Sequence, residues 1–207
     1  MLPIYTSETL GKIETLFAKT YPDRSLIEEA SQAAFHWINA RFNQDTRILV
    51  VAGRGNNGSD AICVAAECQV AGFNCTLLSL QNPEKMGEAA ANAYADFKQA
   101  EGKLAEEAQE DQHFDLIIDG LFGTGLNRAP QSEDAAIINW INAQHTPVLA
   151  LDMPSGLDAA TGVAFGASVQ ADWTLSFIGL KAGLLTGRDA SNAGEIHLAA
   201  LHIDAAI

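Results

Sequence analysis

The chain has 207 residues, a length that fits one domain or at most two small ones. Its 48% hydrophobic content, with 17 Gly and 6 Pro, is that of an ordinary globular protein and excludes a disordered or fibrous chain. The formal net charge is −14, from 12 Lys and Arg against 26 Asp and Glu, and such a surface repels nucleic acids and anionic membranes. We therefore expect neither as a partner, and local donors must hold any phosphate ligand.

The termini and the cysteines point to the interior of the cell. The N-terminus has no basic segment followed by an apolar stretch, and no apolar run approaches the roughly 20 residues that span a bilayer, so we expect a cytoplasmic protein. Cys63, Cys68 and Cys75 are odd in number, lie among apolar residues and match no zinc spacing. We expect buried free thiols, since unpaired cysteine packs as a small hydrophobe.

Two amphipathic helices are predicted at the start of the chain. Ser7 can cap the first, whose apolar residues recur at helical spacing. These residues are Leu10, Ile13, Leu16 and Phe17. The second helix has a clearer start, because Ser25 and Glu28 form the S-x-x-E capping box ahead of an apolar face. We expect both helices to pack on a sheet edge or on a partner chain.

Strands and helices alternate from Arg47 onward. Residues 48–52 are continuously apolar, which suits a strand covered on both faces in a parallel sheet. Further strands are predicted at residues 75–80, 114–119, 148–151, 173–177 and 195–198, and helices at residues 61–70, 83–100 and 132–143. The acidic stretch 101–111 is expected to be a helix end and a loop. This alternation predicts a doubly wound α/β sandwich.

The loop after the first strand contains G-x-G-x-x-G between a strand and a helix, at Gly53–Asp60. Its glycines permit close backbone approach, and the following helix N-terminus offers free N–H groups to an anion. A nicotinamide dehydrogenase would need an acidic residue about 20 positions on to hold the ribose, and its absence disfavours that class. The alternative is an Asn-Gly turn in which Asp60 caps the helix.

The third strand ends at Asp119, and a glycine loop follows it. Gly123-Thr124-Gly125 can expose successive N–H groups to an anion, and Arg128 adds a forked cation suited to phosphate oxygens. The sequence therefore predicts an anion site after this strand. A glycine-rich surface turn with a solvated arginine is the alternative.

The fourth strand ends at Asp152, before a turn rich in Pro, Ser and Gly. Because ligands of parallel sheets bind at the carboxyl ends of the strands, we expect Asp60, Asp119 and Asp152 to converge on one rim. Hard oxygen ligands there select an alkali or alkaline-earth ion over zinc. Lys181 follows a late strand and could reach the same rim; a capped turn and a solvated lysine are the alternatives.

Four motifs in this order resemble the YjeF N-terminal domain family, the NAD(P)H-hydrate epimerases. They are G-x-G-N-N-G-x-D, D-x-x-x-G-T-G-L-x-R, L-D-x-P-S-G-L-D and a later K-x-G. The resemblance covers nearly the whole chain and implies a Rossmann-like three-layer αβα sandwich with a mostly parallel sheet and two leading helices. It also implies an isomerase that interconverts the R and S forms of NADH or NADPH hydrated at nicotinamide C6.

The resemblance assigns the site residues position by position. The implied substrate contacts are Asn56, Asn57, Gly58, Ser59, Asp60, Gly123, Thr124, Gly125, Leu126, Asn127, Arg128, Ala129 and Asp152. One potassium ion per chain would bind to Asn57, Asp119 and Ser155. The first loop departs from the family's usual G-N-N-G-G-D-G, because Ser59 and Ala61 replace two glycines. Either change would crowd the ligand or stiffen the loop.

The implied reaction requires an acid for the departing hydroxide and a base for the incoming water. Asp152 is the first candidate for proton transfer, because its loop matches the family's ligand-binding Asp, and Lys181 is the second, as an electrostatic or proton partner. A potassium ion would mainly order the loops and balance the carboxylates.

The resemblance also implies partners. The family's product feeds an ADP- or ATP-dependent dehydratase, fused or separate, and we expect residues 1–207 to form one epimerase domain without a dehydratase domain. A homodimer is expected. The competing interpretation is a non-catalytic nucleotide-binding or protein-interaction scaffold of the same fold. Loss of the site aspartates would favour it, whereas Asp60, Asp119 and Asp152 are all present.

Overall fold

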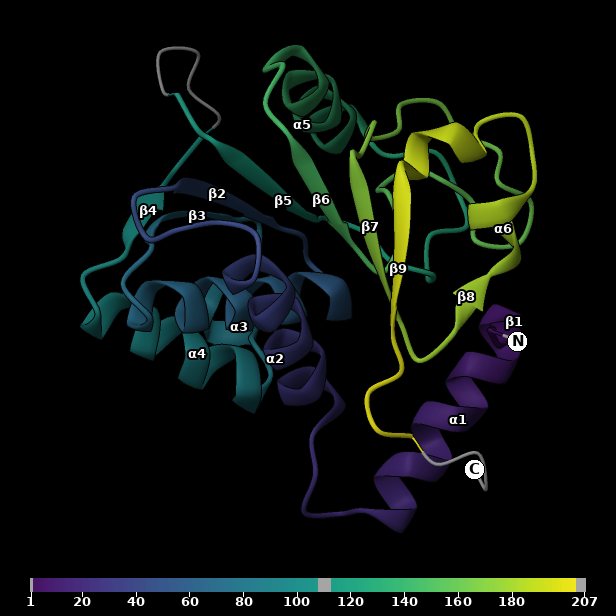
Figure 1. Ribbon diagram of the computed structural model, residues 1–207, viewed down its shortest axis with the longest axis horizontal. Coiled ribbons are helices and arrows are strands. Elements are labelled where there is room, and N and C mark those ends of the chain that lie inside the picture. The colour runs from purple at the N-terminus through teal and green to yellow at the C-terminus, as the bar shows by residue number, and fades with distance from the viewer. Residues whose placement is uncertain (1, 108–112, 204–207) are drawn as a thin grey trace.

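The computed structural model describes residues 2–107 and 113–203 and places a seven-stranded parallel sheet between two layers of helices (Figure 1). The strand order is β4-β3-β2-β5-β6-β7-β9. The bounds are β2 Arg47–Ala52, β3 Asn74–Ser79, β4 Lys103–Ala105, β5 Leu116–Gly120, β6 Val148–Leu151, β7 Trp173–Phe177 and β9 Glu195–Ala199. The α/β sandwich predicted from the alternating pattern is confirmed.

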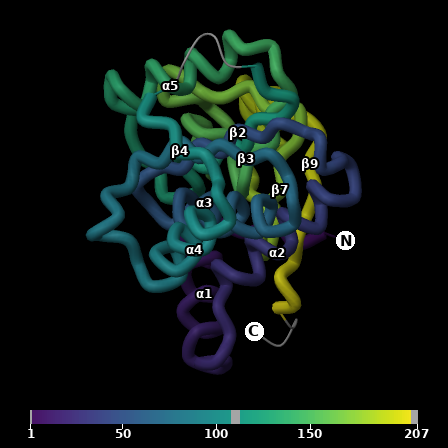
Figure 2. The backbone as a smooth tube through the Cα atoms, turned by 90° about the vertical axis from the view of Figure 1, so that its left-hand side faces the viewer, coloured from purple at the N-terminus to yellow at the C-terminus, as the bar shows by residue number. Residues whose placement is uncertain are grey.

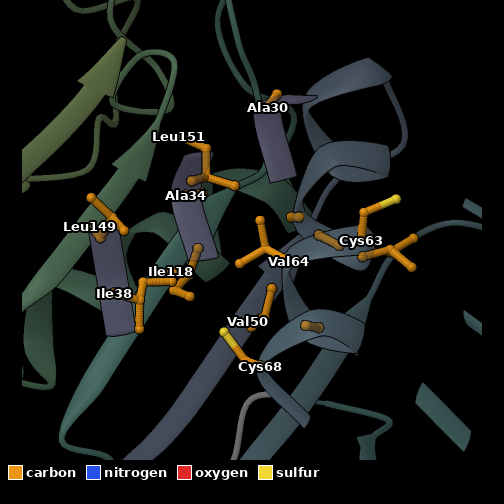
Figure 3. Close-up of a cluster of buried hydrophobic side chains, with 14 of the residues drawn as sticks. Ala30, Ala34, Ile38, Val50, Cys63, Val64, Cys68, Ile118, Leu149 and Leu151 are labelled. Carbon is orange, nitrogen blue, oxygen red and sulfur yellow. The ribbon is translucent and has the colours of Figure 1, made fainter. Parts of the chain in front are cut away.

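Helices cover both faces of the sheet. The bounds are α2 Leu26–Asn39, α3 Asn56–Val70 and α4 Glu88–Gln99 on one face, and α5 Ser132–Ala143 on the other (Figure 1). Successive strand residues point to opposite faces: Ile48 and Val50 pack with α2, α3 and α4, whereas Leu49 packs with α5. This double burial explains why the strand at 48–52 is continuously apolar instead of alternating. Figure 3 shows the larger cluster, which includes Cys63 and Cys68.

The first helix, α1 Ser7–Thr20, lies outside the two main layers. Figures 1 and 2 both place it beyond α2, near the chain that follows β9. A short strand before it, β1 Ile4–Tyr5, pairs in parallel with β8 Leu180–Lys181. This small second sheet anchors the N-terminal segment beside the last part of the chain.

Helix capping follows the sequence closely. Ser25 caps α2 by accepting a hydrogen bond from the backbone N–H of Glu28 at 3.4 Å, as the capping box predicts. The predicted cap of α1 is wrong by one residue, because Thr6 accepts from the backbone N–H of Thr9 at 3.1 Å and Ser7 is the first helical residue.

Several predicted boundaries differ from the structure, among them that of the strand predicted at 114–119, which runs from Leu116 to Gly120. Helix α3 begins at Asn56 instead of residue 61. Most of the segment predicted to be a glycine loop therefore forms the start of this helix. The predicted helix over 83–100 is interrupted: η1 Pro83–Lys85 is a 3₁₀ turn, and α4 starts after its cap, Gly87. The acidic stretch contains the edge strand β4, which pairs with β3; residues 108–112 of this stretch lie outside the described residues.

The remaining elements are short: α6 Ala182–Leu185 and η2 Ala190–Ala193. All three cysteines are buried and free, as predicted. Within residues 2–107 and 113–203, no helix has the length and apolar composition needed to cross a bilayer. The same part of the chain contains no cluster of three or more His, Cys, Asp or Glu side chains suited to a metal ion.

Candidate active site

The carboxyl ends of β2, β5 and β6 open onto a cavity of about 1060 Å³. This volume lies at the upper end of the range for small-molecule sites, about 300–1,000 Å³, and suits a ligand as large as a dinucleotide. The cavity is lined by Asn56, Asn57, Asp60, Asp152, Lys181 and the whole segment 121–131, among others. Every predicted substrate contact except Gly58 and Ser59 is on this wall.

Helix α3 begins directly at the cavity. Its N-cap is Gly55, which has no side chain to accept hydrogen bonds from the first N–H groups. Asp60 lies inside the helix and does not cap it. Free N–H groups and the positive end of the helix dipole favour an anion at this point. Asp60 lies one turn further on, where burial, together with the charges of Asp152 and Glu14, raises the pKa of its carboxyl well above the ordinary value.

The two departures from the family's loop do not line the cavity. The Ser59 hydroxyl accepts a hydrogen bond from Nε2 of Gln81 at 3.2 Å, on the side of β3. Ala61 is fully buried against β5, where a Cβ placed on Gly120 would lie only 2.3 Å from the Ala61 Cβ. Gly58 packs on Gly53 in the same way, since an added Cβ would lie 1.8 Å from the Gly53 carbonyl oxygen. Gly58 and Ala61 therefore serve the close packing of α3, and Ser59 links α3 to Gln81.

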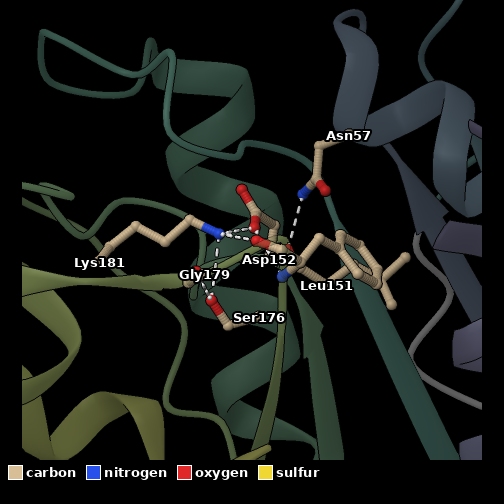
Figure 4. A network of polar contacts seen from close by, with 7 residues as sticks. Asn57, Leu151, Asp152, Ser176, Gly179 and Lys181 are labelled. Atoms are coloured by element: carbon tan, nitrogen blue, oxygen red, sulfur yellow. Dashed lines mark hydrogen bonds and ion pairs between the residues drawn. The ribbon is translucent and has the colours of Figure 1, made fainter. Parts of the chain in front are cut away.

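Lys181 reaches the rim as predicted, but as a buried ammonium instead of a solvated one. It is 1% exposed, and its Nζ donates to Oδ1 of Asp152, to Oγ of Ser176 at 3.1 Å and to the carbonyl oxygen of Phe177 at 3.0 Å (Figure 4). All three of its donors are therefore in use. A buried charge needs such compensation, and here the compensating anion is the candidate catalytic carboxylate.

The backbone around this ion pair is unusual. Asp152 has φ 65° and Ile178 has φ 66°, and a positive φ is costly for a β-branched residue. The backbone N–H of Phe177 donates to Asp152 Oδ1 at 3.2 Å and links the two strained segments. On the other side of the carboxylate, a Cβ placed on Gly123 would lie 3.4 Å from Asp152 Oδ2. Strain of this kind is typical of sites where function fixes a side chain.

Asp119 lies beneath the cavity instead of on its rim, so the predicted convergence of three carboxylates is wrong in this respect. Its side chain is fully buried and accepts hydrogen bonds from the N–H of Ser155 at 2.8 Å, the Oγ of Ser155 at 2.6 Å and the N–H of Leu121 at 3.2 Å. Burial raises the pKa of this carboxyl to about 6. Of the three predicted carboxylates, Asp60 and Asp152 line the cavity; Asp134, which was not predicted, lines it too.

The donor set proposed for potassium passes one structural test. Nδ2 of Asn57 donates to the carbonyl oxygen of Leu151 at 3.1 Å, which fixes the amide's orientation (Figure 4). Its Oδ1 is buried and has no hydrogen-bond partner among the described residues. A hard monovalent cation requires buried oxygens of this kind, and Asp119 and Ser155 are also fully buried oxygen-bearing side chains. Asn57, Asp119 and Ser155 therefore fit the ion.

The end of the cavity suited to phosphates carries two arginines. Arg128 is exposed and makes no ion pair with any residue that the structure describes. Arg54, which the sequence analysis did not assign, lines the same wall, where its guanidinium is held by Asp134 at 2.8 Å and by Glu133 at 3.6 Å. The signal for Arg54 was its position inside the glycine motif, between two glycines.

The leading helices line the cavity and do not merely cover a sheet edge, a role that the sequence analysis missed. Together with the β7–β8 turn and the chain after β9, they contribute an apolar wall: Leu10, Leu26, Ile27, Ala30, Phe177, Ile178 and Leu201. Glu14 of α1 stands on this wall. Partial burial and the negative charge of Asp152 raise the pKa of Glu14, and the positive charge of Lys181 partly offsets this.

Comparison with known proteins identifies the family. The family model described as YjeF-related protein N-terminus matches residues 23–183. The chain belongs to this family. The YjeF-related chain is 40% identical over 176 residues to the NAD(P)H-hydrate epimerase of Achromobacter xylosoxidans, covering 84% of this chain and 85% of that protein. It is 37% identical over 180 residues to the Escherichia coli bifunctional NAD(P)H-hydrate repair enzyme Nnr.

The two relatives differ in length. The match to the Escherichia coli enzyme covers 86% of this YjeF-related chain but only 35% of that protein. Among solved structures, yeast ynu0 (YNL200c) has a TM-score of 0.76 and 17% identity, covering 95% of this chain and 87% of that one. This likeness establishes the fold alone.

Proposed function

We propose that the chain is an NAD(P)H-hydrate epimerase, an isomerase that interconverts the R and S forms of NADH or NADPH hydrated at C6. The observation that carries this is the Asp152–Lys181 pair facing a cavity of dinucleotide size in a member of the YjeF-related family. Support also comes from the Achromobacter relative, whose name is NAD(P)H-hydrate epimerase and whose length this chain covers to 85%.

The two ends of the cavity suit the two ends of the substrate. The pyrophosphate would lie at the N-terminus of α3 and the loop Gly123–Arg128, where backbone N–H groups and a guanidinium can meet its oxygens. The hydrated nicotinamide ring would lie at the apolar wall beside Asp152, where Phe177 and Ile178 would shield C6 from bulk water. Water exclusion matters because it lets the protein decide which water molecule reaches C6.

The chemistry needs proton transfer and little else. Loss of the C6 hydroxyl leaves a cation that the ring nitrogen's lone pair stabilises, and water can return to the opposite face. Asp152 is suited to exchange a proton with the hydroxyl or the water, because its Oδ1 is fixed by Lys181 and Phe177 while Oδ2 lies next to Gly123 at the cavity. Lys181, with its donors in use, holds Asp152 in place and stabilises its charge.

We include one potassium ion per chain in the proposal, held by Asn57, Asp119 and Ser155. When bound, it would supply a positive charge to the buried carboxylate and join the loops that follow β2, β5 and β6. The side chains of Asn57 and Asp119 supply oxygens in a buried position, as such an ion needs. The ordered loops, and not the ion, then position Asp152.

The partner proposed for this activity is a dehydratase that consumes one epimer. The Escherichia coli and Leishmania major relatives are named bifunctional repair enzymes, and this chain matches about a third of each. A homodimer and a cytoplasmic location complete the proposal. Light scattering of the purified chain at micromolar concentration tests the dimer.

A coupled assay tests the activity. Purified chain is mixed with the R form of NADH hydrate and a dehydratase specific for the S form. Recovery of NADH is followed by absorbance. We expect recovery only when the chain is present. If the chain binds the hydrate without accelerating recovery, the non-catalytic scaffold is the correct function.

A further inference from the structure

Helix α1 carries a carboxylate where its pattern calls for an apolar residue. The helix turns Leu10, Ile13 and Phe17 toward the molecule, and these are its buried residues. Glu14 follows Leu10 by four positions and precedes Phe17 by three, so it shares their face. Glu14 is nevertheless exposed, as is Leu16 on the outer side of the helix, at 43%. A helix with leucine at position 14 and glutamate at position 16 would be more regularly amphipathic. The stability of α1 therefore does not explain the presence of Glu14.

Glu14 lines the cavity without a partner among the described residues. Helix α1 lies outside the seven-stranded sheet (Figures 1 and 2). Glu14 therefore contributes to the cavity from a different part of the fold than the residues at the strand ends. It makes no hydrogen bond or ion pair with any residue in 2–107 or 113–203. The charged groups that it meets across the cavity are Asp152, Lys181 and Asp60.

The other groups of the site are less available. Lys181 is 1% exposed and uses its donors on Asp152, Ser176 and Phe177, so it has no free donor for a substrate. Asp60 lines the cavity from α3, which packs on the strands that end there and so lies on the same side as Asp152, whereas Glu14 reaches the cavity from α1. Epimerisation needs two proton-transfer groups, because hydroxide leaves from one face of the ring and water arrives at the other.

We propose, on the basis of the epimerase function above, that Glu14 is the second proton-transfer group of the reaction. A ring lying between α1 and the strand ends would present one face to Glu14 and the other to Asp152. Partial burial and the neighbouring negative charge raise the pKa of Glu14, which keeps a larger fraction of it in the acid form near neutral pH. Its access to solvent lets the proton be replaced after each turnover.

The proton balance of the step is as follows. Protonated Glu14 donates its proton to the C6 hydroxyl as the C6–O bond breaks, and the bond's electron pair leaves with the oxygen as water. A second water forms the new C6–O bond on the opposite face and gives its proton to the carboxylate of Asp152. The opposite epimer uses the same two groups with their roles exchanged, and solvent restores the starting protonation states.

The test compares Glu14→Gln with Glu8→Gln, a matched change on the same helix. Glu8 is 77% exposed, pairs with Lys12 and does not line the cavity. In Glu14→Gln we expect kcat for R/S exchange to fall by about 10²-fold or more while KM changes less than about threefold. We also expect the loss of the limb of the pH–rate profile in which the rate falls as pH rises. Glu8→Gln should match the wild type, and Glu14→Asp should recover part of the rate.

Two results would overturn the inference. One is a Glu14→Gln variant with wild-type kcat and an unchanged pH profile. The other is a variant whose KM rises at constant kcat, which would mean that Glu14 only shapes the binding wall. Both are distinct from failure of the proposed function, because in that case the wild-type chain itself would not exchange the epimers. Circular dichroism at matched concentrations confirms that α1 is folded in each variant.

Discussion

The Asp152–Lys181 pair ties the chemistry of the site to the stability of the fold. Lys181 is among the largest fully buried side chains, and its charge is balanced by Asp152. Breaking a buried pair by removing one partner is costly, because it leaves an uncompensated charge in a medium of low dielectric constant. A substitution at Asp152 therefore acts on activity and on stability at the same time.

The variant Asp152→Asn separates these effects when combined with Lys181→Met. We expect Asp152→Asn alone to lose roughly 3 kcal/mol of unfolding free energy, the scale for a broken buried ion pair, and to lower epimerisation about 10²–10⁴-fold. The double variant should recover most of the stability, since no buried charge remains, but none of the activity. Urea unfolding and the coupled assay measure the two quantities. Near-normal exchange in Asp152→Asn would exclude it from proton transfer.

Individual site residues were predictable from the sequence where a motif names them. Asp152 and the glycine loop stand at strand ends, and the periodicity of the strands placed those ends correctly. Glu14 was not predictable, because it lies in a leading helix with another evident role, whereas Arg54 stands inside the glycine motif and was simply not assigned. Their contribution depends on which elements the fold brings to the same cavity, and one sequence does not state this.

At the scale of elements, three loops meet around buried oxygens. Asn57 is the second residue of α3, Asp119 the last but one of β5, and Ser155 follows β6, so an ion bound among them would join segments that are distant in sequence. The Ser155 hydroxyl also accepts from the N–H of Phe122 at 2.8 Å, which already fixes the loop after β5. A cation would add to this link.

Potassium should therefore stabilise the protein. We expect the melting temperature to rise by several degrees when choline is replaced by potassium at about tenfold above its dissociation constant, since such binding adds about 1.4 kcal/mol. Asp119→Asn should abolish the increase, whereas Asp45→Asn, which removes the same charge from an exposed position, should keep it. Differential scanning fluorimetry measures the shift. Equal melting temperatures in both salts would contradict the proposed ion.

The starts of β2 and β5 are joined by a separate electrostatic link. Asp115 accepts from the N–H of Arg47 at 2.9 Å and from its guanidinium at 2.9 and 2.8 Å. These bonds hold the pKa of Asp115 well below its usual range. A lowered folded-state pKa gives stability that is present above about pH 4 and is lost as pH falls through the folded value.

The variant Asp115→Asn tests this link. At pH 7 we expect it to be modestly less stable than the wild type, because the pair is exposed and solvent screens it. Below about pH 4 the difference should shrink, because the unfolded wild-type chain then takes up a proton on Asp115 that the folded protein, with its lowered pKa, does not bind. Urea midpoints at pH 7 and pH 3 measure the trend. A difference that grows toward low pH would show that the pair does not act through this charge.

At the scale of the whole molecule, the layers of the fold were predictable and the ends of some elements were not. Continuous apolar strands and helical periodicity report burial, which fixes the α/β sandwich. The early start of α3 escaped prediction because Gly58 reads as a loop residue, although the helix needs a glycine there to pack on Gly53. Edge strand β4 escaped it because two of its three residues are exposed and carry no buried pattern.

The net charge of −14 sets the conditions under which the cavity can hold a dinucleotide. Among the cavity-lining cations that the structure describes, Lys181 is paired with Asp152 and Arg54 with Asp134. Arg128 has no carboxylate partner in this part of the chain. Repulsion between the protein and the phosphates must therefore be overcome locally, by Arg128 and the backbone N–H groups around Gly123–Gly125.

Arg128→Ala should accordingly weaken binding of the NADPH hydrate about 10–100-fold without unfolding the protein. A charged hydrogen bond to phosphate contributes about 1.5–3 kcal/mol, and each 1.4 kcal/mol or so is tenfold in affinity. Lys19→Ala removes the same charge from an exposed position outside the cavity and should change affinity little. Because salt screens exposed charges, the gap between wild type and Arg128→Ala should narrow as ionic strength rises. Isothermal titration calorimetry at two salt concentrations measures both effects, and equal affinities at low salt would place the phosphates elsewhere in the cavity.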